Sequence, residues 1–156
     1  RAQQLTAVSG GLHVGKDGMR LKEWIARYNE KAPEPFQRDR RFRLHFLPAR
    51  GFCEVGQTAD MLLIHQLCGD ARFWRDRVSS LARKLKKARC GTICIRPEIK
   101  AYIRLFGFRV EKEEPLPHGL FRYHCRHKET GKRGLASPAF QYLATGKTAY
   151  FITWEP

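Results

Sequence analysis

The sequence predicts an α/β (α+β) domain with a mixed sheet flanked by helices. Segments with the alternation of half-buried strands are interspersed with segments whose apolar residues recur at helical spacing. Between residues 61 and 95, an apolar strand, a long amphipathic helix and a second strand follow one another, and such a crossover forms a right-handed parallel unit. The chain has 156 residues, including 10 Phe, 5 Tyr and 3 Trp, and this is enough to build one packed domain.

The first part of the chain predicts one helix among short strands. Residues 18–30 carry apolar side chains at helical spacing, and Pro35 stops that helix from continuing. A strand within residues 4–14 is expected to break at Gly10-Gly11, and the apolar run of residues 61–68 is expected to be buried on both faces. The strands predicted here lie at residues 4–14, 42–47, 52–56 and 61–68.

The clearest helix is expected over residues 72–88, with Cys90-Gly91 ending it. Arg75 and four further basic residues lie off its apolar stripe, so they predict a basic outer face. The stripe consists of Trp74, Val78, Leu81, Leu85 and Ala88.

The rest of the chain predicts a short helix and four more strands. Pro97 is well placed as the first residue of that helix, and Gly107 is expected to end it. Its buried face should consist of Ile99, Ile103 and Phe106. Residues 128–139 are rich in turn formers, and residues 140–144 suggest one helical turn. The strands are expected at residues 92–95, 108–111, 120–124 and 148–154.

Charge is the strongest signal in the composition. Thirty Lys and Arg against fifteen Asp and Glu leave a net charge of +15, more than solubility requires. Such a chain attracts polyanions, so nucleic acid is the first partner to consider. An anionic cofactor is the second, and an acidic protein or a membrane surface is the third.

The cysteines favour reduced thiols and no metal. Five scattered Cys residues do not form a disulfide framework. Cys90 and Cys94 with His124, Cys125 and His127 lack the usual zinc-ligand spacing, so no metal is expected. No apolar run approaches the roughly 20 residues of a membrane span, and the N-terminus lacks the apolar core of a signal peptide. We therefore expect a cytoplasmic protein with no membrane partner.

The element order and the segment AYIRLFGF, residues 101–108, resemble the GNAT superfamily of acyl-coenzyme A N-acyltransferases. In that family a short helix commonly ends in a large apolar residue followed by Gly-Phe and a strand, although this ending is also a common helix C-cap. The resemblance implies a single GNAT-like domain over residues 1–156. Its core covers about residues 4–125, and residues 126–156 form an extension with an appended C-terminal strand.

The same resemblance implies a mostly antiparallel central sheet in which two parallel strands splay apart to admit the cofactor. It implies an N-acyltransferase that uses acetyl-CoA or another acyl-CoA, with an unknown acceptor. Small, basic GNAT-like chains also resemble proteins of phages and prophages. A phage origin would place the protein in the host cytoplasm or in the virion.

The resemblance places the cofactor where the strand of residues 61–68 meets the long helix. The family usually has Gln or Arg-x-x-Gly-x-Gly or Ala there, so that backbone N–H groups can hold the pyrophosphate. Of that motif this chain retains Gly69, whereas Phe73 and Trp74 are bulky and Asp70 is acidic as well as a good N-cap. The residues assigned to the cofactor are Leu67, Cys68, Gly69, Asp70, Ala71 and Arg72.

The candidate catalytic residues are Glu54, His65 and Tyr102. Family members often use a Tyr four residues before the Gly of Gly-Phe to reprotonate the leaving thiolate. Ile103 holds that place here, and Tyr102 is one residue early, on another helical face. A base commonly lies near the middle strands, where Glu54 and His65 are available. A lone His or Glu in a strand is also commonly a structural residue with satisfied hydrogen bonds.

The alternative is a GNAT-like protein that has lost the chemistry and binds nucleic acid or serves in phage assembly. Phe42 or Tyr123 would then be available for base stacking. The residues expected to neutralise phosphates are Arg38, Arg40, Arg41, Arg43, Arg83, Lys84, Lys86 and Lys87.

Overall fold

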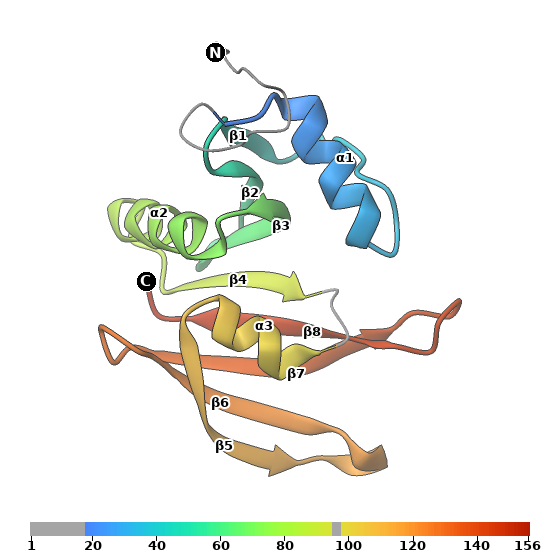
Figure 1. The fold of residues 1–156 in the computed structure, drawn as a ribbon. Helices are drawn as coiled ribbons and strands as arrows, with labels where there is room; N and C mark the ends of the chain where they lie inside the picture. Colours follow the sequence, from blue (N-terminus) through green and yellow to red (C-terminus); the bar gives the residue numbers. More distant parts are fainter. Residues whose placement is uncertain (1–17, 95–97) are drawn as a thin grey trace.

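The computed structural model describes residues 18–94 and 98–156, which fold into an α+β domain around one eight-stranded sheet (Figure 1). The strand order is β1-β2-β3-β4-β8-β7-β6-β5. The helices are α1 (Leu21–Lys31), α2 (Ala71–Lys84) and α3 (Ile99–Leu105). The strands are β1 (Arg43–Leu47), β2 (Gly51–Gln57), β3 (Met61–Gly69), β4 (Arg89–Cys94), β5 (Phe108–Pro115), β6 (Phe121–His127), β7 (Arg133–Gln141) and β8 (Thr148–Trp154).

The predicted class is confirmed, because the sheet is mixed and mostly antiparallel. Within the described residues, β3 and β4 form the one parallel pair, and α2 joins them as the crossover predicts. Their pairing covers four residues of each strand, from Met61↔Arg89 to Ile64↔Thr92. The rest of β3, residues 65–69, has no partner on the β4 side.

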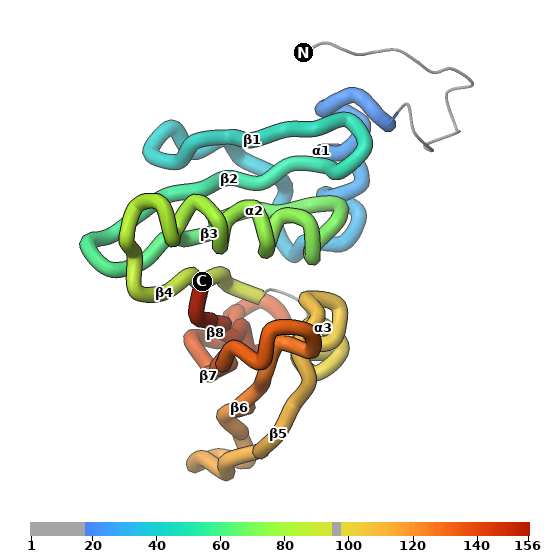
Figure 2. Tube along the Cα trace, turned by 90° about the vertical axis from the view of Figure 1, so that its left-hand side faces the viewer, coloured from blue at the N-terminus to red at the C-terminus, as the bar shows by residue number. Residues whose placement is uncertain are grey.

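Helices α1 and α2 cover opposite faces of β1, β2 and β3 (Figure 2). The alternation of β2 sets this arrangement. Phe52 packs against Tyr28 of α1, whereas Val55 lies with Trp74 and Val78 of α2. Both neighbouring faces therefore contribute to the core, and β2 is buried over most of its length.

Helix α2 ends four residues earlier than predicted. Lys87 N–H bonds to the Ala82 carbonyl and Lys86 N–H to that of Arg83, which is a Schellman closure, and Lys86 takes the left-handed conformation that Gly usually fills. Leu85 is consequently exposed rather than part of the buried stripe. The chain ends the helix here because Ala88 and its neighbour already bond to the Asp60 carbonyl and lead into β4.

The prediction for Arg75 is also wrong. This residue lies on the inner side of α2 and is 3% exposed, instead of on a basic outer face. Its guanidinium donates to the Phe106 carbonyl at the end of α3 and pairs with Asp76. Arg75 therefore joins the start of α2 to the turn at Gly107.

The C-terminal part has more strand than predicted. Residues 133–141 form β7, where turns and one helical turn were expected. Gly134 and Pro138 misled the analysis, because β7 tolerates both residues while pairing with β6 and β8 and has a register irregularity just after Pro138. The last strand, β8, lies inside the sheet between β4 and β7.

Some expectations fall outside the described residues, namely the strand within residues 4–14 and the helix start at Pro97. Strands β5 and β6 are longer than predicted, and the buried residues of α3 are as expected. In residues 18–94 and 98–156, no helix has the length and apolar character needed to cross a membrane.

Replacing Gly107 by Ala should destabilise the fold by more than the same change at Gly131. Both glycines have positive φ, so each Ala incurs about 1–2 kcal/mol of backbone strain. A Cβ at Gly107 would also collide with Nη1 of buried Arg75, which adds roughly 1–3 kcal/mol, whereas Gly131 has open space. Urea unfolding of both variants measures the difference. Equal losses would show that Arg75 is not held against this turn.

Candidate functional site

A buried carboxylate, Glu54, lies at the centre of the described structure with 0% exposure. Its Oε1 atom contacts His65 Nδ1 at 3.0 Å and accepts a hydrogen bond from Gln66 Nε2 at 2.6 Å. Its Oε2 atom accepts from Arg38 Nη1 at 2.7 Å and from the backbone N–H of Asp39 at 3.0 Å. Four donors thus compensate the cost of burying the charge.

A β-bulge brings two consecutive side chains of β3 to this carboxylate. Cys53 pairs with Leu67 and Val55 with Ile64, so Glu54 alone faces His65 and Gln66 together. A bulge bends its strand and re-aims side chains. It begins directly after Ile64, the last β3 residue paired with β4, so it lies where the two strands part.

The hydrogen bonds to Glu54 decide its charge. Burial alone would raise the pKa of Glu54, but donation from Gln66, the Asp39 backbone, His65 and Arg38 together holds that pKa below its usual value. The carboxylate is therefore ionised at neutral pH and a weak base. It is suited to orient a neighbour rather than to accept a proton itself.

The neighbour that Glu54 orients is His65. An ionised carboxylate can only accept, so His65 Nδ1 carries a proton and, in the neutral ring, Nε2 keeps its lone pair. Phe42 stacks on the imidazole with ring centroids 4.4 Å apart, which fixes the ring plane. Sequence reasoning named both Glu54 and His65, and the structure brings them together as a dyad.

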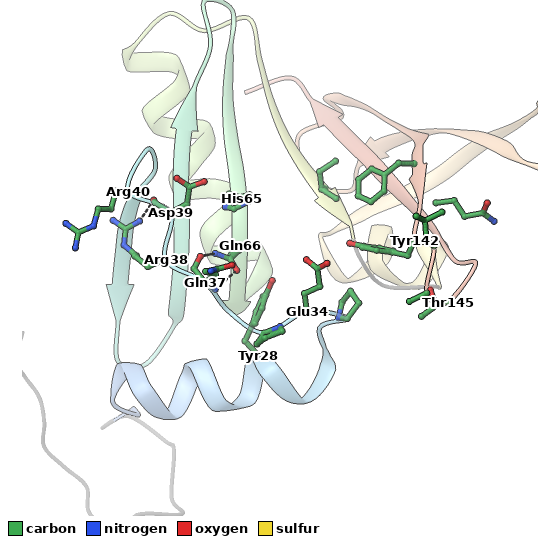
Figure 3. A pocket seen from close by; sticks show the side chains of 17 residues that line it. Tyr28, Glu34, Gln37, Arg38, Asp39, Arg40, His65, Gln66, Tyr142 and Thr145 are labelled. Atoms are coloured by element: carbon green, nitrogen blue, oxygen red, sulfur yellow. Dashed lines mark hydrogen bonds between the residues drawn. The ribbon is translucent and has the colours of Figure 1, made fainter.

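The dyad borders a pocket of about 990 Å³, which we call the large pocket (Figure 3). One wall comes from β3 and the segment before β1, and the other comes from the β7–β8 hairpin, which carries Tyr142. Tyr28 and Glu34 lie between these walls. Within the described residues, no Lys or Arg forms an ion pair with Glu34.

Tyr28 also lines a second pocket of about 440 Å³, the small pocket, at the C-terminal end of β3. Burial, followed by the nearby Tyr142, Cys68, Glu54 and Glu34, raises the pKa of Tyr28 to about 12. Its hydroxyl therefore stays protonated and can donate. The helical pattern had marked Tyr28 only as a core residue, and nothing in the sequence indicated that it joins two pockets.

The small pocket contains most of the residues that the sequence assigned to a cofactor. Its lining from β3, α2 and α3 consists of Leu67, Cys68, Gly69, Ala71, Tyr102 and Leu105. Tyr102 thus lies in this pocket and packs against Phe106, whereas Glu54 does not line it and His65 borders the large pocket.

Asp70 and Arg72 make contacts within the protein. The Asp70 side chain caps α2 by accepting from Phe73 N–H at 3.0 Å, and it pairs with Arg50 at 2.6 Å. Arg72 donates to the Leu105 and Arg104 carbonyls at 3.3 Å. The first turn of α2 is therefore partly occupied by its own N-cap.

Helix α1 supplies two basic residues to the small pocket that sequence reasoning missed, Arg27 and Lys31. No Asp or Glu is among the described residues that line this pocket. The signal was present in the sequence as the polar face of α1, but the partner surface for that face could not be identified. The small pocket has a polarity that suits an anionic ligand.

The eight residues proposed for nucleic acid do not form one surface. Arg38 and Arg40 line the large pocket, and Arg38 is committed to Glu54. Arg41 pairs with Asp39 at 2.8 Å. The others lie elsewhere: Arg43 opens β1, and Arg83, Lys84, Lys86 and Lys87 lie at the C-terminal end of α2.

Across residues 18–94 and 98–156, no three His, Cys, Asp or Glu side chains gather as metal ligands. Burial raises the pKa of Cys90 to about 11 and that of Cys125 to about 12, which disfavours the thiolate form. Comparisons with protein-family models, with curated proteins and with solved structures found no match for this chain.

Replacing Glu54 by Gln should reduce stability at pH 7 by roughly 1.5–3 kcal/mol, the range for losing hydrogen bonds to a charged group. The lowered pKa also predicts a pH dependence. The contribution of Glu54 is complete above its ordinary pKa near 4.5 and is lost as the pH falls through the lower folded value. The variant should therefore lose less stability than the parent between pH 5 and the acid limit.

Glu114→Gln is the matched control, because Glu114 also contacts a His and an Arg, at 2.8 and 3.1 Å, but is partly exposed. Chemical unfolding from pH 3 to pH 7 should show a smaller effect for this change. Similar losses in the two variants would contradict the central role of the Glu54 network.

Proposed function

We propose that this chain is an acyl-coenzyme A-dependent N-acyltransferase. The acyl-CoA would lie in the small pocket, and the acceptor amine would enter the large pocket. The element order of the GNAT superfamily supports this function, as does the separation of the two parallel strands. The observation that carries the proposal is that β3 and β4 part after Ile64↔Thr92, beside two pockets that share Tyr28.

The free edge of β3 suits the extended arm of coenzyme A. Residues 65–69 bond to β2 on one side, while no described strand pairs with their β4 side. An unpaired strand edge offers N–H and C=O groups that amides of an extended ligand can match. Leu67 and Leu105 add apolar wall, and the phosphates would face Arg27 and Lys31.

Acyl-CoA supplies an activated thioester, and the protein's residues supply proton transfer. His65 Nε2 accepts the proton that the amine loses as its nitrogen attacks the thioester carbonyl. When the carbon–sulfur bond breaks, the Tyr28 hydroxyl donates its proton to the departing sulfur. Glu54 stabilises the imidazolium that forms, as a buried carboxylate beside a catalytic His does.

The large pocket favours a cationic acceptor. Glu34 has no ion pair among the described residues, and it lies with Tyr28 and Tyr142. A carboxylate beside aromatic rings attracts an ammonium group. A primary amine therefore fits this pocket better than a hydroxyl acceptor.

The net charge of +15 favours a second function, the binding of a polyanion. One coenzyme A carries only about four negative charges, so most of the basic residues would have no role in its binding. Nucleic acid is the natural polyanion for a chain of this charge.

Acetyl-CoA should raise the melting temperature of the parent protein, because a ligand that binds only the native state stabilises it. The double variant Arg27→Ala/Lys31→Ala should bind acetyl-CoA at least tenfold more weakly, since it removes two charges from the pocket. Lys22→Ala on the same helix, outside the pocket, should leave binding unchanged. Isothermal titration calorimetry measures all three. No melting shift at millimolar acetyl-CoA would refute the acyltransferase proposal.

His65→Gln should lower the rate of thiol release from acetyl-CoA, measured with a panel of primary amines, by roughly 10²–10⁴-fold. Its affinity for acetyl-CoA should not change, because His65 lies outside the small pocket. The control is His124→Gln, which alters a second His that contacts a Glu, at 2.8 Å, but away from both pockets. If both variants keep the parent rate, His65 is not the base.

A further inference from the structure

A groove with basic walls runs between α2 and the edge of the sheet formed by β1 and β2. It has a volume of about 310 Å³ and lies on the opposite face of these strands from α1. Its floor includes Val55 and Trp74, and its polar lining includes His45, Arg77 and Lys84. None of the described residues that line it is acidic.

The basic residues around this groove differ from those elsewhere because they lack acidic partners. In the described part of the chain, no carboxylate forms an ion pair with Arg43, Arg77 or Lys84. By contrast, β5 and β6 hold their charges in pairs such as Arg126–Glu111 at 3.0 Å. Fifteen acidic residues cannot neutralise thirty basic ones, and part of the excess collects here.

The local field is positive enough to act on a neighbouring side chain. Burial lowers the pKa of His45, and the charges of Arg77 and Arg43 lower it further. The nearest acidic residue on α2 is Asp76, which Arg75 already engages at 2.7 Å. The positive charges of the groove are therefore left to interact with an external anion.

The end of α2 extends this surface. Arg83 and Lys86 are exposed beside Lys84 and have no ion pair among the described residues. Lys87 is instead held by the Thr58 and Ala59 carbonyls, at 2.6 and 3.3 Å. The unpaired charges thus form a row along α2 and the start of β1.

We propose that the groove between α2 and β1 binds the sugar–phosphate backbone of a nucleic acid. The chemistry favours this ligand over an acidic protein, because protein interfaces have an apolar centre. Among the described residues, the large exposed apolar side chains Leu105, Phe140 and Leu143 lie away from the groove, and Leu85 alone is near its end. A row of unpaired cations without an apolar patch matches a phosphate backbone.

This inference does not rest on the acyltransferase proposal, because the groove shares no lining residue with the large or the small pocket. It also revises the set of eight basic residues. Arg43 and Lys84 keep their role in it and Arg77 joins them, while Arg38 and Arg41 have intramolecular partners.

Fluorescence anisotropy with labelled 20-nucleotide single-stranded and duplex DNA, at 50 and 200 mM salt, tests the proposal. The parent should bind at low salt and lose affinity as salt rises, because neutralised phosphates release counterions. Arg77→Glu/Lys84→Glu should weaken binding at least tenfold and reduce the salt slope by about two contacts. The two DNA arms show which form the groove prefers.

The matched control is Arg109→Glu/Lys112→Glu on β5, the opposite edge strand, which removes the same net charge. It should change affinity less than threefold. Equal weakening in both double variants would assign binding to net charge and overturn the site. Absence of binding at low salt, or groove-dependent binding of heparin without binding of DNA, would also overturn it. If the Glu variant fails to fold by circular dichroism, Arg77→Gln/Lys84→Gln takes its place with the same criteria.

Discussion

The burial of one carboxylate, Glu54, organises the centre of this protein. A buried charge must be matched by hydrogen-bond donors, and Glu54 takes them from β3 and from the segment that precedes β1. Two of its partners are consecutive residues, His65 and Gln66, and a regular strand would point them to opposite faces. The bulge in β3 resolves this conflict, and the bend that accompanies it coincides with the separation from β4.

The pockets follow from that separation. Where β3 and β4 part, Tyr28 of α1 lies at the boundary of both pockets. The small pocket receives basic residues from α1, whereas the large pocket contains the unpaired carboxylate of Glu34. This difference in polarity suits an anionic substrate on one side and a cationic one on the other, with His65 and Tyr28 available for proton transfer between them.

The excess positive charge is distributed unevenly. Several arginines are consumed by the fold itself, such as Arg75 at the end of α3 and Arg38 at Glu54. The groove beside α2 is different, because its cations have neither acidic partners nor a structural carbonyl to satisfy. Charge that stabilises nothing within the described structure is the charge most readily assigned to a partner.

The sequence by itself determined the element types wherever apolar periodicity was strong. Helices α1 and α3, strands β1 to β3, the parallel crossover and the final strand could all be predicted, because local spacing decides which face is buried. The sequence also pointed to Glu54 and His65 as chemically useful residues. Tertiary structure decided the rest: that β7 is a strand despite Gly134 and Pro138, since pairing on both sides outweighs local propensity, and that α2 stops at Lys84. It also decided that Glu54 and His65 form a pair and that Tyr28 joins two pockets, because these contacts arise between segments whose relative placement no local pattern encodes.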